Sequence, residues 1–342
     1  MLKTRIEGLP LAVSLGDPAG VGPELICEAW ARRESEGLPP FFVCDGAGVL
    51  EAAASARGLQ VPVERIADPA DAIGCFHRAL PVLGEEDAAY SAGAPDREGS
   101  ALALRSLQRA TALAIEQRAG AVVTAPIAKA ALSEVGFDFP GQTEFLAAAC
   151  GQPDDAVMML AGPQLRAVPV TVHCALSEVP GRLTIELICD TARTVASALQ
   201  HDFGLENPRL AVAALNPHAG ESGRMGTEDR DIVAPAVHAL RESGIDATGP
   251  HPADTMFAPR ARKTYDAAIA MYHDQALIPL KALDFDEGVN VTLGLPIVRT
   301  SPDHGTAFDL AGTGKGSDAS FLNAIRLADE LTGGVVQQAA AQ

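Results

Sequence analysis

The sequence predicts an α/β fold built on a mostly parallel β-sheet. Along its 342 residues, short apolar runs closed by Gly, Pro or Asp alternate with longer amphipathic stretches. This alternation is typical of β-α-β units. Only 4% of the residues are aromatic, whereas 32 are Gly and 24 are Pro. That composition favours tight strand-to-helix turns over a β-sandwich, and the length fits one large or two closely joined α/β domains.

Strands are expected at the short apolar runs, and helices where apolar residues recur at helical spacing. The expected strands are Leu11–Gly16, Phe41–Asp45, Val61–Ile66, Ala121–Ala125, Ala156–Ala161, Ala167–His173, Arg209–Asn216, Ala267–Tyr272 and Val289–Leu293. The expected helices include Gly22–Arg33, Gly46–Arg57, Ser100–Arg118, Thr184–Gln200, Glu228–Ser243 and Asp318–Thr332. No repeat or low-complexity linker interrupts the pattern, which favours two domains that share one continuous sheet.

Charge and cysteine content narrow the class of protein. The formal net charge of −18 argues against a nucleic-acid partner, which needs a basic face. No polybasic stretch is present to hold the chain on a membrane, and no apolar run reaches the roughly 18 residues of a transmembrane helix. The six Cys are scattered without a CxxC pair, as expected in a reducing cytosol. We therefore expect a cytoplasmic enzyme whose cleft has a few Arg and Lys for an anionic substrate.

Two glycine-rich segments stand out. Gly16–Glu24 (GDPAGVGPE) follows an expected strand and opens an expected helix, so its backbone can approach a ligand closely. It has neither the Walker GK[ST] ending nor the Rossmann spacing, and alone it is typical of an ordinary turn. Ser301–Gly316 (SPDHGTAFDLAGTGKG) is too rich in glycine for a core element. It is either a surface loop or a loop that wraps an adenosine, with Asp309 beside a ribose hydroxyl.

Three histidines, His173, His218 and His273, fall at or near the ends of expected strands. Strand ends of a parallel sheet converge on one crevice. One such His is usually structural, but three in the same kind of place favour a metal site with open positions, suited to Zn²⁺ or Co²⁺. Such a cation would bind a substrate hydroxyl and the adjacent carbonyl. Asp274 beside His273 either supports the metal site or caps the next segment.

Polar and cationic residues follow the last histidine. Lys281 and Arg299 are candidate partners for a phosphate or carboxylate, and Asn290 is a candidate orienting group. Taken singly, each is more typical of a solvated surface. Asp254 lies in GPHPADTMF, a segment too rich in Pro and Gly for a helix, and is expected to line the cleft.

The paired strings GDPAGVGPE and HGTAFDLAG resemble the signatures of the isocitrate and isopropylmalate dehydrogenase superfamily, which binds NAD without a Rossmann domain. The resemblance implies an α/β/α layered fold with two subdomains flanking a cleft. Residues 1–126 plus 296–342 would form the cofactor-side subdomain, and 127–295 the metal, substrate and dimerisation subdomain. The residues expected to bind the cofactor are Gly16, Asp17, Gly305, Thr306 and Asp309.

Between Leu11 and about Asn323 the chain closely resembles the 4-hydroxythreonine-4-phosphate dehydrogenase family of vitamin B6 synthesis. The strings are SLGDPAGVGPE, VTAPIAK, GQTEFLA, NPHAGE, GPHPADTMF, MYHDQALIPLK and TSPDHGTAFDLAGTGKG. The resemblance implies oxidation of 4-phosphohydroxy-L-threonine by NAD or NADP and decarboxylation to 3-amino-2-oxopropyl phosphate. It also implies one divalent ion per site (Zn, Co, Mg or Mn) and a homodimer with a shared active site. Position by position, it implies His173, His218 and His273 as metal ligands, Gln142, Thr143, Lys281, Asn290 and Arg299 as substrate-binding residues, and Lys281, Asp254 and Asp274 as catalytic residues.

One position departs from the family pattern. The family usually reads HTEF where this chain has Gln142 to Phe145 (QTEF). Gln can hydrogen-bond an anion but cannot become cationic. The alternatives are therefore a sister dehydrogenase of 4-phospho-D-threonate, 4-phospho-D-erythronate or an aromatic cis-diol. A non-catalytic binding protein is disfavoured because the other matched positions keep the expected residue type.

Overall fold

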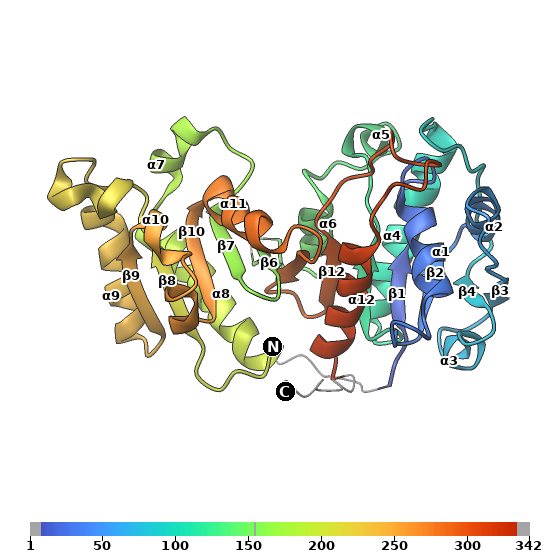
Figure 1. Cartoon of the computed structure of the whole chain (residues 1–342), viewed down its shortest axis with the longest axis horizontal. Helices are drawn as coiled ribbons and strands as arrows, with labels where there is room; N and C mark the ends of the chain where they lie inside the picture. The colour runs from blue at the N-terminus through green and yellow to red at the C-terminus, as the bar shows by residue number, and fades with distance from the viewer. Residues whose placement is uncertain (1–7, 154, 334–342) are drawn as a thin grey trace. The chain divides into compact units, whose positions relative to one another are not determined.

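The computed structural model describes residues 8–153 and 155–333. The chain divides into two compact units, each with its own strands and helices (Figure 1). Unit 1 comprises the described residues of 1–154 and 295–342, and unit 2 comprises 155–294. The predicted α/β class is confirmed in both units.

The first boundary between the units lies later in the chain than the predicted position after residue 126. Helices α5 (Lys129–Ser133) and α6 (Gln142–Ala149) belong to unit 1, and both pack against α4 (Arg97–Ile115). Leu132 and Leu146, one on each short helix, are completely buried. Burial of these side chains keeps the segment with unit 1.

The sheet of unit 1 has the strand order β3-β4-β2-β1-β5-β12, and every adjacent pair in it is parallel. The strands are β1 (Leu11–Ser14), β2 (Phe41–Cys44), β3 (Val63–Ile66), β4 (Leu80–Leu83), β5 (Ala121–Thr124) and β12 (Val298–Pro302). All but β3 are buried along their whole length. Such continuous burial is expected of parallel strands that helices cover on both faces.

Helices pack on this sheet as a doubly wound fold requires. The remaining helices of unit 1 are α1 (Gly22–Ala31), α2 (Ala47–Ala56), α3 (Asp71–Cys75) and α12 (Ala319–Leu331). Helices α1 and α12 contact each other and are seen in front of the sheet in Figure 1, whereas α4 packs on β1, β2 and β5. The loops that follow β1, β2, β5 and β12 therefore open at one edge of the sheet.

The sheet of unit 2 has the order β11-β6-β7-β10-β8-β9. Strands β7, β10, β8 and β9 are parallel, whereas β6 is antiparallel to both of its neighbours. The strands are β6 (Val157–Ala161), β7 (Arg166–Thr171), β8 (Arg209–Ala213), β9 (Asp246–His251), β10 (Ala267–Tyr272) and β11 (Val289–Leu293). Leu160, Ala268 and Leu280 belong to the apolar core of this unit and are fully buried.

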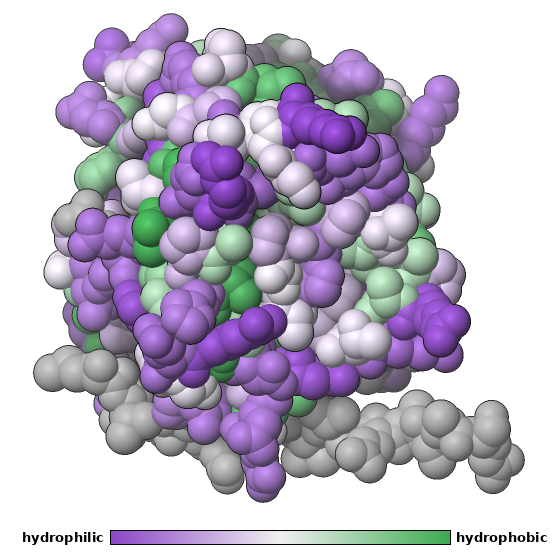
Figure 2. All heavy atoms as spheres, turned by 90° about the vertical axis from the view of Figure 1, so that its left-hand side faces the viewer, coloured by the Kyte–Doolittle hydropathy of each residue, from purple (hydrophilic) through white to green (hydrophobic). Residues whose placement is uncertain are grey.

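The helices of unit 2 alternate with these strands. They are α7 (Val179–Arg182), α8 (Ile185–His201), α9 (Ala234–Glu242), α10 (Ala253–Met256) and α11 (His273–Asp284). Short 3₁₀ segments span Leu176–Glu178, Pro217–Gly223 and Ala261–Thr264, and a π-helical turn spans Asp229–Val233. Seen from the side of α9 and β9, the surface in Figure 2 is mostly polar. None of the helices in the described part of the chain has the length and hydropathy to cross a membrane.

All nine predicted strands are present, but three further strands were missed. Each contains a proline, namely Pro81 in β4, Pro250 in β9 and Pro302 in β12. Proline cannot donate a ladder hydrogen bond, but its presence alone does not explain the omissions, since the predicted strand Ala167–His173 contains Pro169. Helix α11, which contains Pro279, was also not predicted. This omission matters because α11 begins at His273 and carries Asp274 and Lys281.

Candidate functional site

Two of the three predicted metal ligands lie together in unit 2. His173 follows β7, and His273 follows β10 directly as the first residue of α11. The two strands are parallel neighbours, and Thr171 pairs in register with Tyr272. The hydroxyl of Thr171 also donates to the Met271 carbonyl over 2.8 Å. As a result the two imidazole rings have centroids 6.1 Å apart.

His218 lies after β8, the other neighbour of β10, in a loop with unusual backbone geometry. Its φ is 52°, and Ala219, Glu221 and Ser222 also have positive φ. Consecutive left-handed residues cost roughly 1–2 kcal/mol each and are typical of functional segments. Within the described part of one chain, no group of three or more His, Cys, Asp or Glu side chains is placed to hold a metal. His218 is therefore not brought into a three-ligand cluster with the other two.

The chemistry of the pair fits a divalent ion. Nδ1 of His273 lies 2.8 Å from Oδ1 of Asp274, which leaves Nε2 to act as the ligand. A carboxylate behind a ligating His is the usual supporting group of such sites. Catalytic zinc sites take three protein ligands, so the His173 and His273 pair needs one more donor.

A buried carboxylate shapes the loop that carries His218. Asp229 is only 2% exposed. Its Oδ1 accepts from the Leu215 N–H over 2.7 Å, and its Oδ2 accepts from the Asn216 N–H over 3.0 Å and from Asn216 Nδ2 over 3.1 Å. Glu228 also accepts from Asn216 Nδ2, over 2.8 Å. This role of Asp229 was not predicted, because it depends on tertiary hydrogen bonds that no spacing pattern indicates.

Other predicted residues of unit 2 are spread over three elements. Lys281 lies on α11, eight positions after His273 and thus close to the same helix face. Asn290 lies in β11, and its Oδ1 is buried without a hydrogen-bond partner among the described residues. A buried acceptor without a hydrogen bond lowers the stability of the fold. Such a group is expected where a ligand supplies the missing donor. Asp254 is exposed on α10, which contacts the His218 loop. The prediction that its segment is not helical was wrong, because Pro250 and Pro252 precede the first residue of this short helix and do not interrupt it. Asp274 is exposed at the start of α11.

Unit 1 contains a buried cation. Arg299 in β12 is 4% exposed. Its guanidinium donates to Thr124 Oγ1, from Nε over 3.2 Å and from Nη2 over 2.6 Å, and to Gln142 Oε1 over 2.9 Å. Burial lowers the pKa of Arg299 to about 10, although the negative charge of Glu144 opposes this shift. A guanidinium is suited to bind a phosphate, and Thr143 follows Gln142 on α6.

The two glycine-rich loops of unit 1 lie against each other. The Val21 N–H donates to the Thr306 carbonyl over 2.9 Å, and a Cβ at Gly20 would be crowded by the same carbonyl. Asp17 is 1% exposed; its Oδ1 accepts from the Ala19 N–H over 3.0 Å, and its Oδ2 has no partner within the described ranges. Burial raises the pKa of this carboxyl. A close pair of loops with an unsatisfied buried acceptor fits a dinucleotide bound by hydrogen bonds.

The remaining predicted cofactor residues lie on the same loops. Gly16 has a φ of +73°, and a side chain there would collide with Ala125. Gly305 faces open space, and Asp309 is exposed. The predicted set is therefore brought to one edge of the sheet, with Asp309 on its solvent side.

The chain is similar to known proteins along most of its length. The family model of pyridoxal phosphate biosynthetic protein PdxA matches residues 38–328. A protein of Erythrobacter litoralis named 4-hydroxythreonine-4-phosphate dehydrogenase is 62% identical over 322 residues, which are 94% of this chain and 96% of that protein. The crystal structure of the enzyme of that name from Klebsiella pneumoniae has a TM-score of 0.85 and 39% identity, covering 95% of this chain and 100% of its own.

More distant structures place the fold in a wider group. A terephthalate 1,2-cis-dihydrodiol dehydrogenase from Burkholderia xenovorans is 28% identical, with a TM-score of 0.63 and coverage of 96% of this chain and 99% of its own. A beta-decarboxylating dehydrogenase from Thermococcus kodakarensis is 14% identical, with a TM-score of 0.50 and coverage of 95% and 84%. The latter likeness shows the fold alone. The chain belongs to the family of pyridoxal phosphate biosynthetic protein PdxA.

Proposed function

We propose that this chain oxidises 4-phosphohydroxy-L-threonine with NAD and releases CO₂, giving 3-amino-2-oxopropyl phosphate for pyridoxal 5'-phosphate synthesis. The observation that carries the proposal is the 62% identity, over 94% of the chain, with a relative named 4-hydroxythreonine-4-phosphate dehydrogenase. The side chains of both units support it, because they supply imidazoles, a buried cation and glycine-rich loops in the kinds of place this reaction needs.

The imidazoles of His173, His218 and His273 would hold one divalent ion (Zn, Co, Mg or Mn). When bound, this ion supplies a Lewis acid, and NAD or NADP supplies the oxidant. Asp274 would fix the tautomer and orientation of His273, since the carboxylate already lies against Nδ1. We assign proton transfer to Lys281 and Asp254, whose side chains ionise and belong to elements that carry or contact the imidazole segments.

The substrate's phosphate would bind Arg299, with Gln142 and Thr143 beside it on α6. A bound phosphate would stabilise the charged form of Arg299, because its negative charge offsets the hydration that the guanidinium loses on burial. Lys281 and Asn290 would orient the amino acid part of the substrate, and the unsatisfied Oδ1 of Asn290 would accept from its ammonium group. The cofactor would lie on the loops that contain Asp17 and Thr306.

We further propose a homodimer in which each site takes His218 from the other chain. Support comes from the lack of a three-ligand group within the described residues of one chain. Two large apolar side chains also face solvent: Ile278 on α11 is 65% exposed, and Phe285, which directly follows this helix, is 72% exposed. Such exposure is typical of surfaces that a partner covers. The cytoplasmic location stays a prediction.

An NADH-formation assay tests the proposed activity. Purified full-length protein, loaded with Zn²⁺, Co²⁺ or Mn²⁺, is given 4-phosphohydroxy-L-threonine and NAD or NADP, and CO₂ release is measured in parallel. Prolonged chelation should abolish turnover, and returning the metal should restore it. Full activity in a preparation shown by elemental analysis to be metal-free would contradict the metal role.

A sister dehydrogenase is the second candidate, and Gln142 is the observation that favours it. A neutral amide in place of the family's His changes the charge available beside Arg299. The same assay therefore includes 4-phospho-D-threonate, 4-phospho-D-erythronate and a terephthalate cis-diol. The substrate with the highest kcat/KM decides between the candidates. No turnover of any of them would contradict both.

A further inference from the structure

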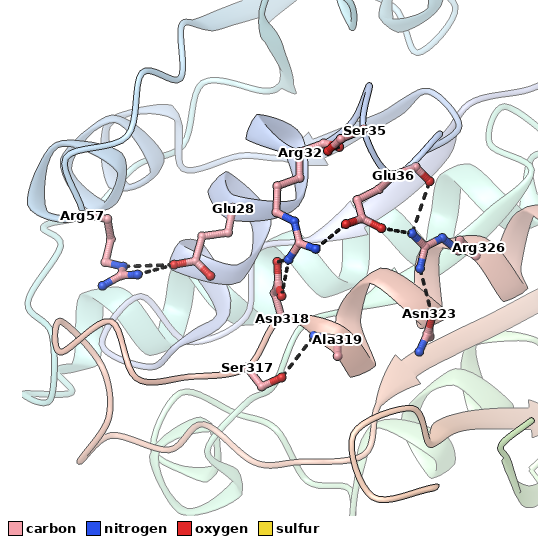
Figure 3. Close-up of polar contacts among 10 residues, drawn as sticks. All are labelled: Glu28, Arg32, Ser35, Glu36, Arg57, Ser317, Asp318, Ala319, Asn323 and Arg326. Atoms are coloured by element: carbon pink, nitrogen blue, oxygen red, sulfur yellow. Dashed lines mark hydrogen bonds and ion pairs between the residues drawn. The ribbon is translucent and has the colours of Figure 1, made fainter.

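One face of α1 carries charged residues at every fourth position. Glu24 and Glu28 lie within the helix, Arg32 caps it, and Glu36 follows in the next turn, where its N–H donates to the Arg32 carbonyl over 2.9 Å. Residues four apart lie one above another on a helix surface. Three of these side chains, Glu28, Arg32 and Glu36, are seen along the helix in Figure 3.

The outer part of this row anchors the end of the loop that joins β12 to α12. Arg32 Nη1 binds the carboxylate of Asp318 over 2.8 and 2.6 Å. Glu36 accepts from both Arg32 and Arg326, which lies on α12 (Figure 3). The Arg32 side chain is 47% exposed, so water screens these pairs and they hold the loop weakly.

The inner part of the row is buried and centres on Glu24. This side chain is 5% exposed, and both of its carboxylate oxygens are engaged. Oε1 accepts from the Tyr90 hydroxyl over 2.8 Å and from the N–H of Gly312. Oε2 lies 3.3 Å from Nε of Arg57. A buried carboxylate with these partners is far stronger as an anchor than an exposed pair.

Arg57 completes the inner anchor. Its guanidinium also binds Glu28, with Nε 3.1 Å from Oε1. A Cβ at Gly314 would overlap the guanidinium, and Gly314 has a φ of +71°. Glycine at this position therefore lets the loop backbone lie directly against Arg57.

Helix α1 thus contacts the loop of residues 304–318 at three places. They are Thr306 near its start, Gly312 in its middle and Asp318 at its end. The middle anchor also joins a third segment, because Tyr90 comes from the loop after β4. The neighbouring Gly93 N–H donates to the Ala19 carbonyl over 2.8 Å. The middle anchor therefore ties three loops at the edge of the unit 1 sheet.

We propose that Glu24 is a positioning residue for the dinucleotide, acting through Gly312, Tyr90 and Arg57. This inference rests on the proposed function, in which the loops containing Asp17 and Thr306 bind NAD. Glu24 does not face the cofactor, because burial and its three partners occupy the carboxylate. It holds the loop backbone in one conformation before NAD arrives, so that binding does not have to order the loop.

Isothermal titration of the metal-loaded, full-length protein with NAD tests the inference. Glu24→Ala removes all three contacts and should raise the Kd for NAD by roughly 10- to 100-fold, as misplacement of a binding group does. Glu24→Gln keeps an oxygen for Tyr90 and Gly312 but loses the charge that pairs with Arg57, so its effect should be smaller. Tyr90→Phe removes one hydrogen bond and should raise the Kd by roughly 5-fold.

A matched control and a second readout separate positioning from general stability. Glu64→Ala removes a carboxylate of the same unit that pairs with Arg78 over 2.5 Å and is 42% exposed; its Kd for NAD should equal that of the wild type. In the Glu24 variants the KM for NAD should rise, while kcat at saturating NAD and the Kd for metal stay unchanged. Tm is measured for every variant.

The outcomes distinguish this inference from the proposed function. A wild-type protein that binds neither NAD nor NADP overturns both. A wild type that binds NAD, with Glu24 variants that bind it equally well at lower Tm, overturns the positioning role alone. If Glu24→Ala does not fold, Glu24→Gln and Tyr90→Phe decide, and an unchanged Kd in both overturns the inference.

Discussion

The guanidinium of Arg299 and the side-chain amide of Gln142 are joined by a hydrogen bond of 2.9 Å from Nη2 to Oε1. The amide is used on both sides, because its Nε2 donates to the Ala125 carbonyl over 3.2 Å. Gln142 therefore holds the buried cation in place without adding or removing charge. The residue that departs from the family pattern is thus a direct contact of the proposed phosphate site.

Gln142→His should make substrate binding depend on pH. Neutral imidazole has one donor and one acceptor nitrogen and can replace both amide contacts. Once protonated, it loses the acceptor for Arg299 but adds a positive charge for a bound phosphate. The KM for the phosphorylated substrate should therefore fall several-fold from pH 8 to pH 6, relative to the wild type over the same range.

The wild-type profile serves as the reference because the substrate phosphate titrates in the same range. Gln142→Leu is the matched control: it removes both contacts and should raise KM at every pH. Parallel KM profiles for wild type and Gln142→His would show that residue 142 does not reach the anion.

Arg299→Ala should raise the substrate Kd by about 30- to 150-fold, which corresponds to a loss of roughly 2–3 kcal/mol of binding free energy. This is the cost of losing a charge-assisted contact to a buried anion. Arg299→Lys keeps the charge but loses the planar fork, so its effect should be intermediate. The Kd for NAD should stay unchanged in both. Calorimetry with substrate and with NAD measures the two affinities.

An exposed arginine provides the control for this prediction. Arg209 pairs with Asp266 over 2.9 Å at 44% exposure in unit 2, and Arg209→Ala should leave the substrate Kd unchanged. If Arg299→Ala binds substrate as tightly as the wild type does, the phosphate lies elsewhere.

Local sequence patterns predicted nine of the twelve strands of the described chain. His173 and His273 could be predicted to meet because parallel strands end at one edge of a sheet. The roles of Asp229 and Glu24 could not be predicted, since each depends on a tertiary hydrogen bond: one to the Asn216 loop and one to Gly312. Patterns of spacing contain no information about such contacts. Helix α11, which contains Pro279, was not among the predicted helices.

Asp229→Asn should weaken metal binding by roughly 10- to 100-fold, as loss of a supporting group around a metal does. Asparagine keeps the shape of the side chain but has one acceptor oxygen where aspartate has two. Its NH₂ group would therefore face one of the two N–H donors, Leu215 or Asn216, and that hydrogen bond would be lost. The left-handed loop that carries His218 would then lose its conformation. Titration with Co²⁺, followed by visible absorption, measures the affinity without turnover.

Asp231 gives the matched control, since it lies two residues away, is 49% exposed and pairs with Arg230 over 2.7 Å. Asp231→Asn should bind Co²⁺ like the wild type. Equal Co²⁺ affinity in Asp229→Asn and Asp231→Asn would mean that the His218 loop needs no buried carboxylate.

His251 should make stability depend on pH. Burial, with the charge of Arg241 adding to it, lowers its pKa below the ordinary value of 6.5. The folded protein thus binds a proton at His251 less readily than the unfolded chain does. The contribution of His251 to the free energy of unfolding is therefore present above pH 6.5 and is lost as pH falls through the folded pKa. His251→Gln should flatten the fall in Tm between pH 7.5 and pH 5.

The exposed His238 on α9, whose side chain is 74% exposed, provides the comparison. His238→Gln should keep the wild-type dependence of Tm on pH. A His251→Gln protein whose Tm falls as steeply as that of the wild type would show that this histidine is not responsible.

The last prediction concerns the sharing of metal ligands between chains. If His218 of one chain completes the pair His173 and His273 of the other, His218→Ala and His273→Ala homodimers should each be inactive. Refolded together, random pairing makes about half the dimers mixed, and each mixed dimer has one intact site, so activity should return to about a quarter of wild type.

The 6.1 Å separation of the His173 and His273 rings within one chain supplies an internal control for this experiment. Those two ligands would come from the same chain, so every site in a refolded mixture of His173→Ala and His273→Ala keeps one lesion and activity should not return. Recovery in both mixtures would place His173 and His273 of one site on different chains. No recovery in either, while refolded wild type regains activity, would assign all three ligands of a site to one chain. Recovery only in the mixture with His218→Ala is the result that the geometry of β7 and β10 predicts.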